Sequence, residues 1–357
     1  MTRFLTTGAA LLLTTSIAQA GGLDRSGQGI GAIFEDGNYA ELSFGIVTPE
    51  VSGTTPATPL SETFTFPESD TGNIGESYNS LGMAIKTDIS DELSVALILD
   101  EPYGAAVEYG TGSLATGGAA TVSSTGITAL ARYKFSENFS VHAGLRNVTA
   151  SGEYSAPNFT PYNSVYEKDS DTGYVVGAAY EIPDIALRVA LTYSSALDFA
   201  LDGSVGDLTA NIPESINLDF QTGIAADTLL FGSIRYVGWN GTELVDTVLE
   251  ANGADPLVAY TNDVITYNIG VGRRLSEQLA VSASIGHEKS TGEPTGNLGP
   301  TDGFTSLSIG AAYTMDTGVE LSGGVRFVRV GDATTTSNFE FADNSVVGVG
   351  FKVGYNF

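Results

Sequence analysis

The stretch NSVVGVGFKVGYNF, residues 344–357, decides the fold class of this chain. Its large apolar side chains fall at every second position, at Val347, Val349, Phe351, Val353, Tyr355 and Phe357. Successive side chains of a strand point to opposite faces, whereas an amphipathic helix repeats every 3.6 residues. The stretch is therefore predicted to be a strand with one apolar face and with Lys352 on the other face.

The same two-residue alternation recurs along the chain, for example over residues 139–146 and 319–327. No segment has the capped amphipathic pattern of a helix. Fourteen strands are predicted, near residues 38–49, 78–88, 92–102, 122–135, 138–152, 172–182, 185–200, 213–224, 227–239, 263–274, 278–288, 303–314, 318–331 and 344–357.

The connections between these strands alternate between short and long. Ile89-Ser90-Asp91 and Ser136-Glu137 are short turns, whereas residues 50–77 and 240–262 are long loops. Transmembrane β-barrels have tight turns at one end and long loops at the other, and a soluble sandwich has no reason for this alternation. The sequence therefore predicts an all-β fold, a transmembrane antiparallel β-barrel of about 14 strands.

The composition excludes several classes of protein. The 357 residues include no cysteine, which excludes disulfides and any metal site that needs cysteine ligands. The formal net charge of −27 argues against a nucleic-acid partner, because such binding needs a basic surface. Hydrophobic residues make up 42% of the chain, which argues against full disorder.

The first 20 residues have the features of a secretory signal peptide. Arg3 is followed by an apolar core around residues 9–13, and Ala18-Gln19-Ala20 is a small-x-small cleavage site. The alternative is a buried N-terminal helix. Residues 1–20 are predicted to be removed, and the mature chain is predicted to be exported.

The inward face of the predicted barrel is comparatively basic. If the apolar face of each strand meets lipid, nine cations fall on the lumen face: Lys86, Arg132, Lys134, Arg146, Arg188, Arg235, Arg274, Arg326 and Lys352. Few acidic residues share that face, so the lumen could concentrate anions. The alternative is that these cations pair with inward acids and backbone carbonyls.

Three of these arginines are candidates for a ligand site. Arg146, Arg235 and Arg326 each lie about eight positions from a short turn, so they are predicted at similar height in the lumen. Arginine can hold a carboxylate with two parallel hydrogen bonds. Apolar lumen positions such as Ile98 and Leu130 suit the tail of an amphiphile. The competing view is that inward acids, namely Glu41, Asp219 and Glu320, neutralise these arginines.

Several short motifs, in their order along the chain, resemble the FadL-type family of outer-membrane transporters. They are SGQGIG at 26–31, NYAELSFG at 38–45, TPEVSG at 48–53, EPYG at 101–104, LTYSS at 191–195 and IRYVGW at 234–239. The resemblance covers most of the mature chain. It implies a 14-strand barrel plugged by an N-terminal hatch, here residues 21–37, with residues 38–357 as the barrel.

The resemblance also implies a function and a location. The family takes up long-chain fatty acids and similar hydrophobic compounds passively, across the outer membrane of Gram-negative bacteria. Expected partners are such a hydrophobic molecule, the lipid and lipopolysaccharide of that membrane, and the barrel insertion machinery. The C-terminal strand ending in Phe357 resembles the motif that this machinery recognises. The hatch is short, however, and lacks the family's Asn-Pro-Ala motif.

The resemblance further implies a lateral opening at a kink in the third strand. Pro102 cannot donate a backbone hydrogen bond and Gly104 permits unusual dihedral angles, so the strand is predicted to break there. Cations near the short-turn ends of their strands are predicted to face the hatch: Lys86, Arg132, Arg188 and Lys352.

Two other functions stay open. One is a general or anion-selective porin, and the other is a barrel hydrolase. His142 and His287 lie on different predicted strands, so no metal site is expected. No catalytic residue and no cofactor is expected either, because no serine has a recognisable histidine and acid partner.

Overall fold

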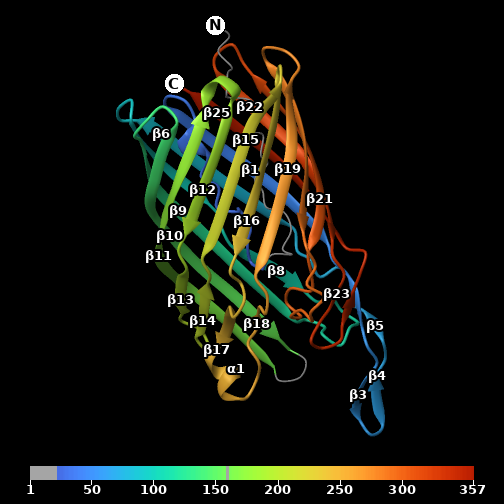
Figure 1. Cartoon of the computed structure of the whole chain (residues 1–357). Coiled ribbons are helices and arrows are strands. Elements are labelled where there is room, and N and C mark those ends of the chain that lie inside the picture. The colour runs from blue at the N-terminus through green and yellow to red at the C-terminus, as the bar shows by residue number, and fades with distance from the viewer. Residues whose placement is uncertain (1–21, 158–160) are drawn as a thin grey trace.

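The computed structural model describes residues 22–157 and 161–357, and the predicted signal peptide lies outside them. Fourteen antiparallel strands close into a barrel, because β25 pairs with β1 over its full length (Figure 1). The predicted fold class and the strand number are therefore confirmed. No helix of the described residues is long and apolar enough to cross a membrane.

The barrel strands follow one another in the sheet in the order of the sequence. They are β1 (Tyr39–Glu50), β6 (Tyr78–Asp88), β7 (Leu93–Asp100), β9 (Ala119–Lys134), β10 (Phe139–Ala156), β11 (Tyr162–Ile182), β12 (Leu187–Ser194), β15 (Ser215–Ala225), β16 (Thr228–Val237), β19 (Val264–Arg274), β20 (Leu279–Glu288), β21 (Phe304–Thr314), β22 (Val319–Val330) and β25 (Ser345–Asn356). A further strand, β8 (Gly104–Glu108), continues the line of β7 along β9.

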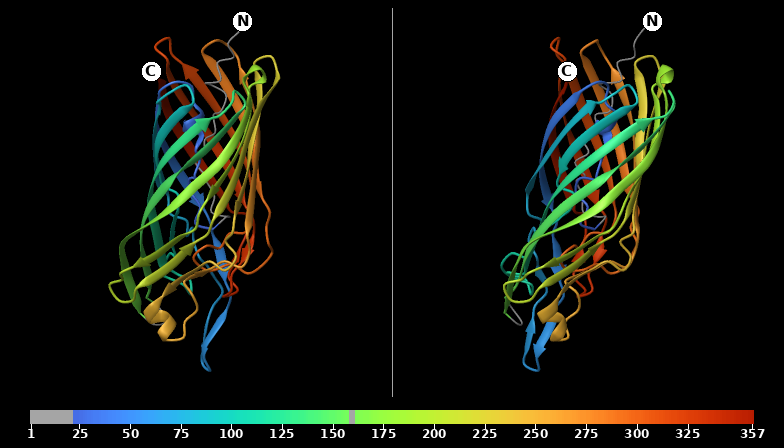
Figure 2. Two further views of the ribbon diagram at one scale, coloured as in Figure 1. Left: turned by 60° about the vertical axis from the view of Figure 1, so that its left-hand side comes forward. Right: turned by 90° about the vertical axis from the view of Figure 1, so that its left-hand side faces the viewer.

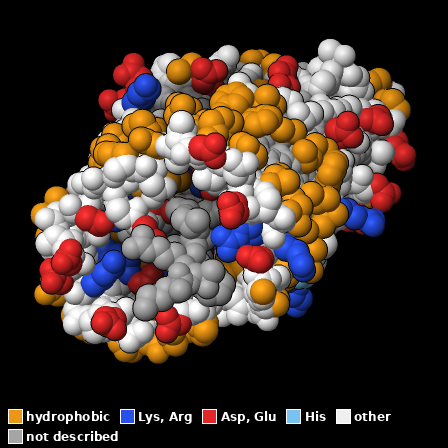
Figure 3. Space-filling model, turned by 90° about the horizontal axis from the view of Figure 1, so that it is seen from above, with side chains coloured by type: hydrophobic (Ala, Val, Ile, Leu, Met, Phe, Trp, Pro, Cys, Tyr) orange, Lys and Arg blue, Asp and Glu red, His pale blue; other side chains and the backbone are white. Residues whose placement is uncertain are grey.

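The alternating side chains of each strand point in turn to the outer surface and to the lumen of the barrel. Phe351 is 58% exposed on the outside, whereas its inward neighbour Lys352 is only partly exposed beside Glu41. Large apolar side chains such as Leu145 and Phe327 cover the outer wall, while the lumen side of the same strands buries Arg146. Figure 3 shows apolar side chains over the flanks and charged ones gathered around the rim.

The two ends of the barrel differ as predicted. The short connections and Phe357 lie at one end, here called the short-turn end, and the extended loops lie at the other, the long-loop end (Figures 1 and 2). One short turn contains η2 (Pro183–Ile185), followed by Ala186 in the left-handed region with φ 52°. A tight turn of this kind leaves the strand register on both sides unchanged.

One predicted strand is two elements. The segment 185–200 ends its barrel pairing at Ser194, and Leu197–Leu201 forms β13 in a separate sheet at the long-loop end. That sheet also contains β14 (Leu208–Ile212), β17 (Glu243–Asp246) and β18 (Val258–Ala259). The hydroxyl of Ser195 accepts a hydrogen bond from the backbone of Tyr174, 2.9 Å away, where the chain leaves the barrel. The apolar alternation continues through the bend, so the sequence pattern hides it.

The long loops contain further structure that the sequence did not predict. The helix α1 (Thr247–Ala251) begins at Asp246, whose carboxylate accepts two backbone N–H groups. A second small sheet comprises β2 (Gly53–Thr55), β5 (Ser69–Asp70), β23 (Ala333–Thr334) and β24 (Glu340–Phe341). The hairpin of β3 (Thr58–Ser61) and β4 (Phe64–Phe66) projects beyond the barrel (Figure 2).

The N-terminal segment, residues 22–37, lies inside the barrel and is called the hatch. It contains the short helix η1 (Gly31–Phe34), whose Ile33 and Phe34 are buried against lumen-facing side chains. These include Ala84, Ala96, Ile98, Leu130, Val175, Ala179 and Ala190. Small residues on the wall leave room for η1, so the hatch fills the lumen near the short-turn end.

Candidate functional site

The third strand of the barrel is broken where the sequence predicts. β7 ends at Asp100 and β8 begins at Gly104, with Pro102 between them. The hydroxyl of Ser124 on β9 bonds both the N–H and the carbonyl of Tyr103, at 2.8 and 2.6 Å. A side chain thus satisfies the backbone groups that the interrupted ladder leaves unpaired.

At this break the third strand loses its pairing with the second strand. The unpaired region, bounded by residues 77–82 and 100–105, is here called the wall window. The register between β6 and β7 ends at Met83 and Leu99. Pairing resumes where the Glu76 N–H donates to the Ala106 carbonyl, 3.2 Å away. Between these points the Glu101 carboxylate accepts a hydrogen bond from the backbone of Leu81.

The hatch supplies the missing partner of the broken strand. The Arg25 N–H donates to the Pro102 carbonyl and the Gly104 N–H donates to the Leu23 carbonyl, each at 2.8 Å. Asp24 and Tyr103 form the antiparallel bridge between these two bonds. Residues 23–25 therefore lie as a short added strand on the lumen side of the wall window.

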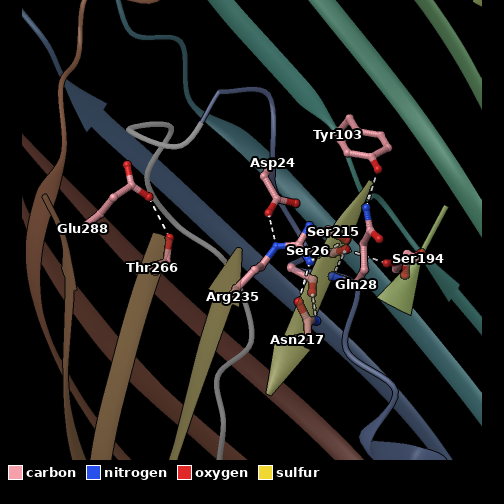
Figure 4. A network of polar contacts seen from close by, with 12 residues as sticks. Asp24, Ser26, Gln28, Tyr103, Ser194, Ser215, Asn217, Arg235, Thr266 and Glu288 are labelled. Atoms are coloured by element: carbon pink, nitrogen blue, oxygen red, sulfur yellow. Dashed lines mark hydrogen bonds and ion pairs between the residues drawn. The ribbon is translucent and has the colours of Figure 1, made fainter. Parts of the chain in front are cut away.

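Arg235 is bound to the hatch (Figure 4). Its Nε lies 2.5 Å from the Asp24 carboxylate, and its Nη1 donates to Asn217 at 2.7 Å and to Ser215 at 3.2 Å. Asn217 in turn donates to the Gly27 carbonyl, 2.9 Å away. The carboxylate that neutralises this arginine thus comes from the hatch rather than from the strands.

Arg146 is also bound to the hatch. Its Nη1 donates to the side chain of Gln28 and, at 3.2 Å, to Ser194, while its Nε donates to Thr128 at 2.8 Å. Gln28 also donates to the Tyr103 hydroxyl. Gln28 has φ 55°, a backbone conformation that residues other than glycine rarely adopt, so its surroundings hold it in a strained state.

Arg326 lies apart from the other two arginines. Its guanidinium carbon is 5.5 Å from the centre of the Phe304 ring, and its Nε has no hydrogen-bond partner among the described residues. The geometry therefore brings Arg146 and Arg235 together through residues 24–28, while Arg326 stands separately with unused donor capacity.

The four predicted hatch-facing cations surround the buried end of the hatch. Arg132 and Arg188 lie over the Phe34 ring, with guanidinium carbons 4.6 and 4.8 Å from its centre. Lys86 donates to the Gly37 carbonyl at 2.6 Å, and Lys352 lies 3.2 Å from the Glu41 carboxylate. The Phe34 ring thus has cation–π contacts with two arginines, which hold this end of the hatch in the lumen.

One hatch carboxylate is placed unfavourably for its charge. Burial raises the pKa of Glu35 to about 7, against the opposing effect of Lys352 and Arg188 and with a smaller contribution from the carboxylates of Glu41 and Glu320. Desolvation disfavours the charged form of an acid. Glu35 in the seated hatch therefore keeps its proton to a higher pH than an exposed glutamate does.

Two cavities adjoin the hatch. The first, called the wall cavity, has a volume of about 220 Å³. It is lined by charged residues such as Arg25, Asp100 and Arg188, by apolar ones such as Ile98, and by residues at the edges of the wall window. The second, called the external cavity, lies at the long-loop end between Leu23 of the hatch and loop residues 257–262.

Sequence reasoning missed Ser26 and Gln28 on the hatch side of these contacts, and it did not pair Asp24 with Arg235. Asp24, Ser26 and Gln28 all contact the wall, and Ser26 donates to Asp100 at 2.5 Å. Their only signal in the sequence is a polar segment ahead of the first strand. His142 lies against Phe34 and Thr192, and the described residues contain no group of three or more metal-ligating side chains.

Solved structures share this architecture, whereas no protein-family model and no curated protein matches the chain. A FadL homologue of Pseudomonas aeruginosa has a TM-score of 0.74 at 15% identity, covering 98% of this chain and 96% of that one. The toluene transporter TodX of Pseudomonas putida has a TM-score of 0.67 at 13% identity, with coverages of 96% and 95%. The toluene transporter TbuX of Ralstonia pickettii has a TM-score of 0.63 at 13% identity, covering 91% of each chain. The resemblance to the FadL-type fold is confirmed.

Proposed function

We propose that this protein is an outer-membrane channel of a Gram-negative bacterium for the passive uptake of long-chain fatty acids or similar hydrophobic compounds. The observation that carries the proposal is the wall cavity, whose lining includes both lumen residues and the edges of the wall window. A channel for hydrated solutes needs an open axis. A channel for apolar cargo needs an apolar path that ends in lipid.

The outer surface suits the bilayer. Outward apolar side chains cover the strands, and the last strand ends with the stacked rings of Tyr355 and Phe357. In the proposed orientation the short-turn end faces the periplasm and the long loops meet lipopolysaccharide. The C-terminal strand would then be the one that the barrel insertion machinery recognises. The signal peptide, residues 1–20, would direct the export.

Cargo would enter at the long-loop end. The external cavity is lined by apolar side chains such as Val122, Leu244 and Val258. The cargo would then pass the hatch to the wall cavity and leave sideways through the wall window beside Pro102 and Gly104. Plugging by η1 between Arg132 and Arg188 favours this lateral exit over release through the short-turn end, and it argues against a general porin.

A fatty-acid head group would bind where the lumen arginines lie. Arg326 has unused donor capacity, and Arg146 and Arg235 hold hatch groups that a carboxylate could replace. A carboxylate on Arg235 would substitute for Asp24 and so loosen the hatch. Binding of the cargo would then release the hatch, because the cargo carboxylate replaces the hatch carboxylate on the same arginine.

An uncharged hydrophobic cargo is the second candidate. Among the described residues that line the external cavity there is no Lys, Arg or His, whereas Glu153, Glu293 and Asp302 are present. Such a lining repels a carboxylate and accepts an uncharged molecule. Two of the similar structures are toluene transporters, which supports this cargo class.

The test is uptake by Gram-negative cells that lack their own hydrophobic channels. Cells that produce the protein should take up labelled oleate or toluene faster than cells with an empty vector. The purified protein should give little steady ion current in a planar bilayer, because the hatch plugs the axis. Large steady conductance without hydrophobic uptake would establish a porin instead. Preference between oleate and toluene distinguishes the two cargo classes.

A further inference from the structure

Arg25 of the hatch lies across the wall window from one edge to the other. Its guanidinium carbon is 3.8 Å from the centre of the Tyr78 ring, on the β6 edge. On the opposite edge, a Cβ added to Gly104 would lie 2.4 Å from the same guanidinium carbon. A side chain at 104 would therefore displace the Arg25 guanidinium from its present position.

Stacking on the ring holds the guanidinium head in this place. Among the described residues, the Arg25 Nε has no hydrogen-bond partner, although it is buried. The Arg25 backbone is fixed by its bond to Pro102. The side chain can thus swing off the ring while the added strand of residues 23–25 stays in place.

Tyr78 lines two neighbouring cavities. A small pocket between the external and wall cavities shares Gly299 and Thr301 with the external cavity. The same pocket shares Val47 and Tyr78 with the wall cavity, which Arg25 also lines. Three neighbouring cavities therefore lie in series from the long-loop end to the wall window, and the stacked pair of Arg25 and Tyr78 stands at the last of them.

We propose that the stack of Arg25 on Tyr78 is the gate of the wall window, and that it opens without removal of the plug at Phe34. The inference rests on the proposed function and adds the residues that control it. The gate lies at the wall window, whereas Arg132 lies over Phe34 and is not among the residues that line the wall cavity. The gate can therefore open while the contact between Arg132 and Phe34 stays in place.

Three substitutions test the gate in the full chain, with uptake and conductance measured together. Arg25→Gln and Tyr78→Leu remove the stack, so the initial rate of toluene uptake by cells should rise about fivefold. Tyr78→Phe keeps the ring face, so uptake should equal that of the wild type. Bilayer conductance should remain at the wild-type value in all three. Arg329→Gln, at an exposed arginine outside the cavities, is the matched control and should change neither uptake nor conductance.

A chemical probe tests the gate independently of any cargo. The chain has no cysteine, so Ser80→Cys introduces a single thiol in the lining of the wall cavity. Its labelling by a membrane-soluble maleimide should be several-fold faster when Arg25→Gln or Tyr78→Leu is added. Unchanged labelling in correctly folded barrels would overturn the gate, as would a rise in conductance in parallel with uptake. Faster labelling without uptake of any probe would instead refute the proposed function.

Discussion

Arg235 is nearly buried in the lumen, where a guanidinium without partners would be strongly destabilising. Asp24, Ser215 and Asn217 provide these partners. Arg146 is held similarly by Gln28. Two of the lumen arginines therefore retain the hatch, and a carboxylate that took the place of Asp24 or Gln28 on them would displace hatch groups.

Replacing the lumen arginines separates cargo binding from structural pairing. Arg326→Gln should weaken oleate binding by about tenfold, because a hydrogen bond to a charged group contributes roughly 1.5–3 kcal/mol. Binding of an uncharged alkane of equal length should not change. Affinities are measured on the purified barrel by displacement of a fluorescent fatty acid. Arg329→Gln, at an exposed position paired with Asp343, is the matched control.

The same substitution at Arg235 has an additional expected effect. Arg235→Gln removes the partner of Asp24, so it should lower oleate affinity and also raise ion conductance. If neither oleate nor alkane binding changes in any of the variants, the arginines are structural and an uncharged cargo is favoured.

Inward and outward positions could be predicted residue by residue, because the two-residue period of a strand is local. Arg146, Arg235 and Arg326 are all buried in the lumen. Their partners could not be predicted, because Asp24 and Gln28 lie far from them in the sequence and reach them only when the hatch folds into the barrel. In the competing view Glu41 would help to neutralise these arginines, but it pairs with Lys352.

The hatch and the third strand act as one element. Residues 23–25 complete the ladder of Pro102 and Gly104, and η1 fills the lumen below them. Deleting residues 22–36 should therefore raise the single-channel conductance severalfold. The deletion removes the plug and both hatch contacts of the lumen arginines. Planar-bilayer recording of the refolded barrel measures the change.

A second deletion provides the control for the hatch. Removing the hairpin of residues 58–66, which projects at the long-loop end, should leave the conductance unchanged. Equal conductance of the hatch deletion and the wild type would show that the segment does not close the lumen.

A break in a strand could be predicted only where the sequence contains a residue that disfavours strand pairing. Pro102 and Gly104 mark the break between β7 and β8. Ser195-Ala196 marks no break, because the alternation continues into β13, and only the pairing of β13 with β14 reveals the separate sheet. The helix α1 was missed because its five residues are too short for a periodic pattern, although Asp246 is a good N-cap.

At the scale of the whole molecule, the proposed function assigns two separate routes to the barrel. Phe34 and the two arginines near it would close the axis, and the cargo would turn from the external cavity toward the wall window. An acidic protein with its axis closed in this way would be poorly suited to carry hydrated anions. A wall window beside lipid lets an apolar cargo avoid water altogether.

The central claim is that cargo leaves through the wall window. It is tested most directly by closing the window with a covalent bond. Leu81→Cys and Glu101→Cys place thiols on its two edges in a chain that has no other cysteine. The pair is joined by oxidation or by a short cleavable thiol reagent. The pair Ile309→Cys and Val325→Cys, across an intact seam between β21 and β22, is the control.

The measurement is the initial rate of labelled oleate and toluene uptake by cells, before and after cross-linking and again after reduction. The account predicts that uptake falls to the empty-vector rate when the window is closed, recovers on reduction, and is unaffected by the control pair. Full uptake through a barrel whose window is demonstrably cross-linked would contradict it.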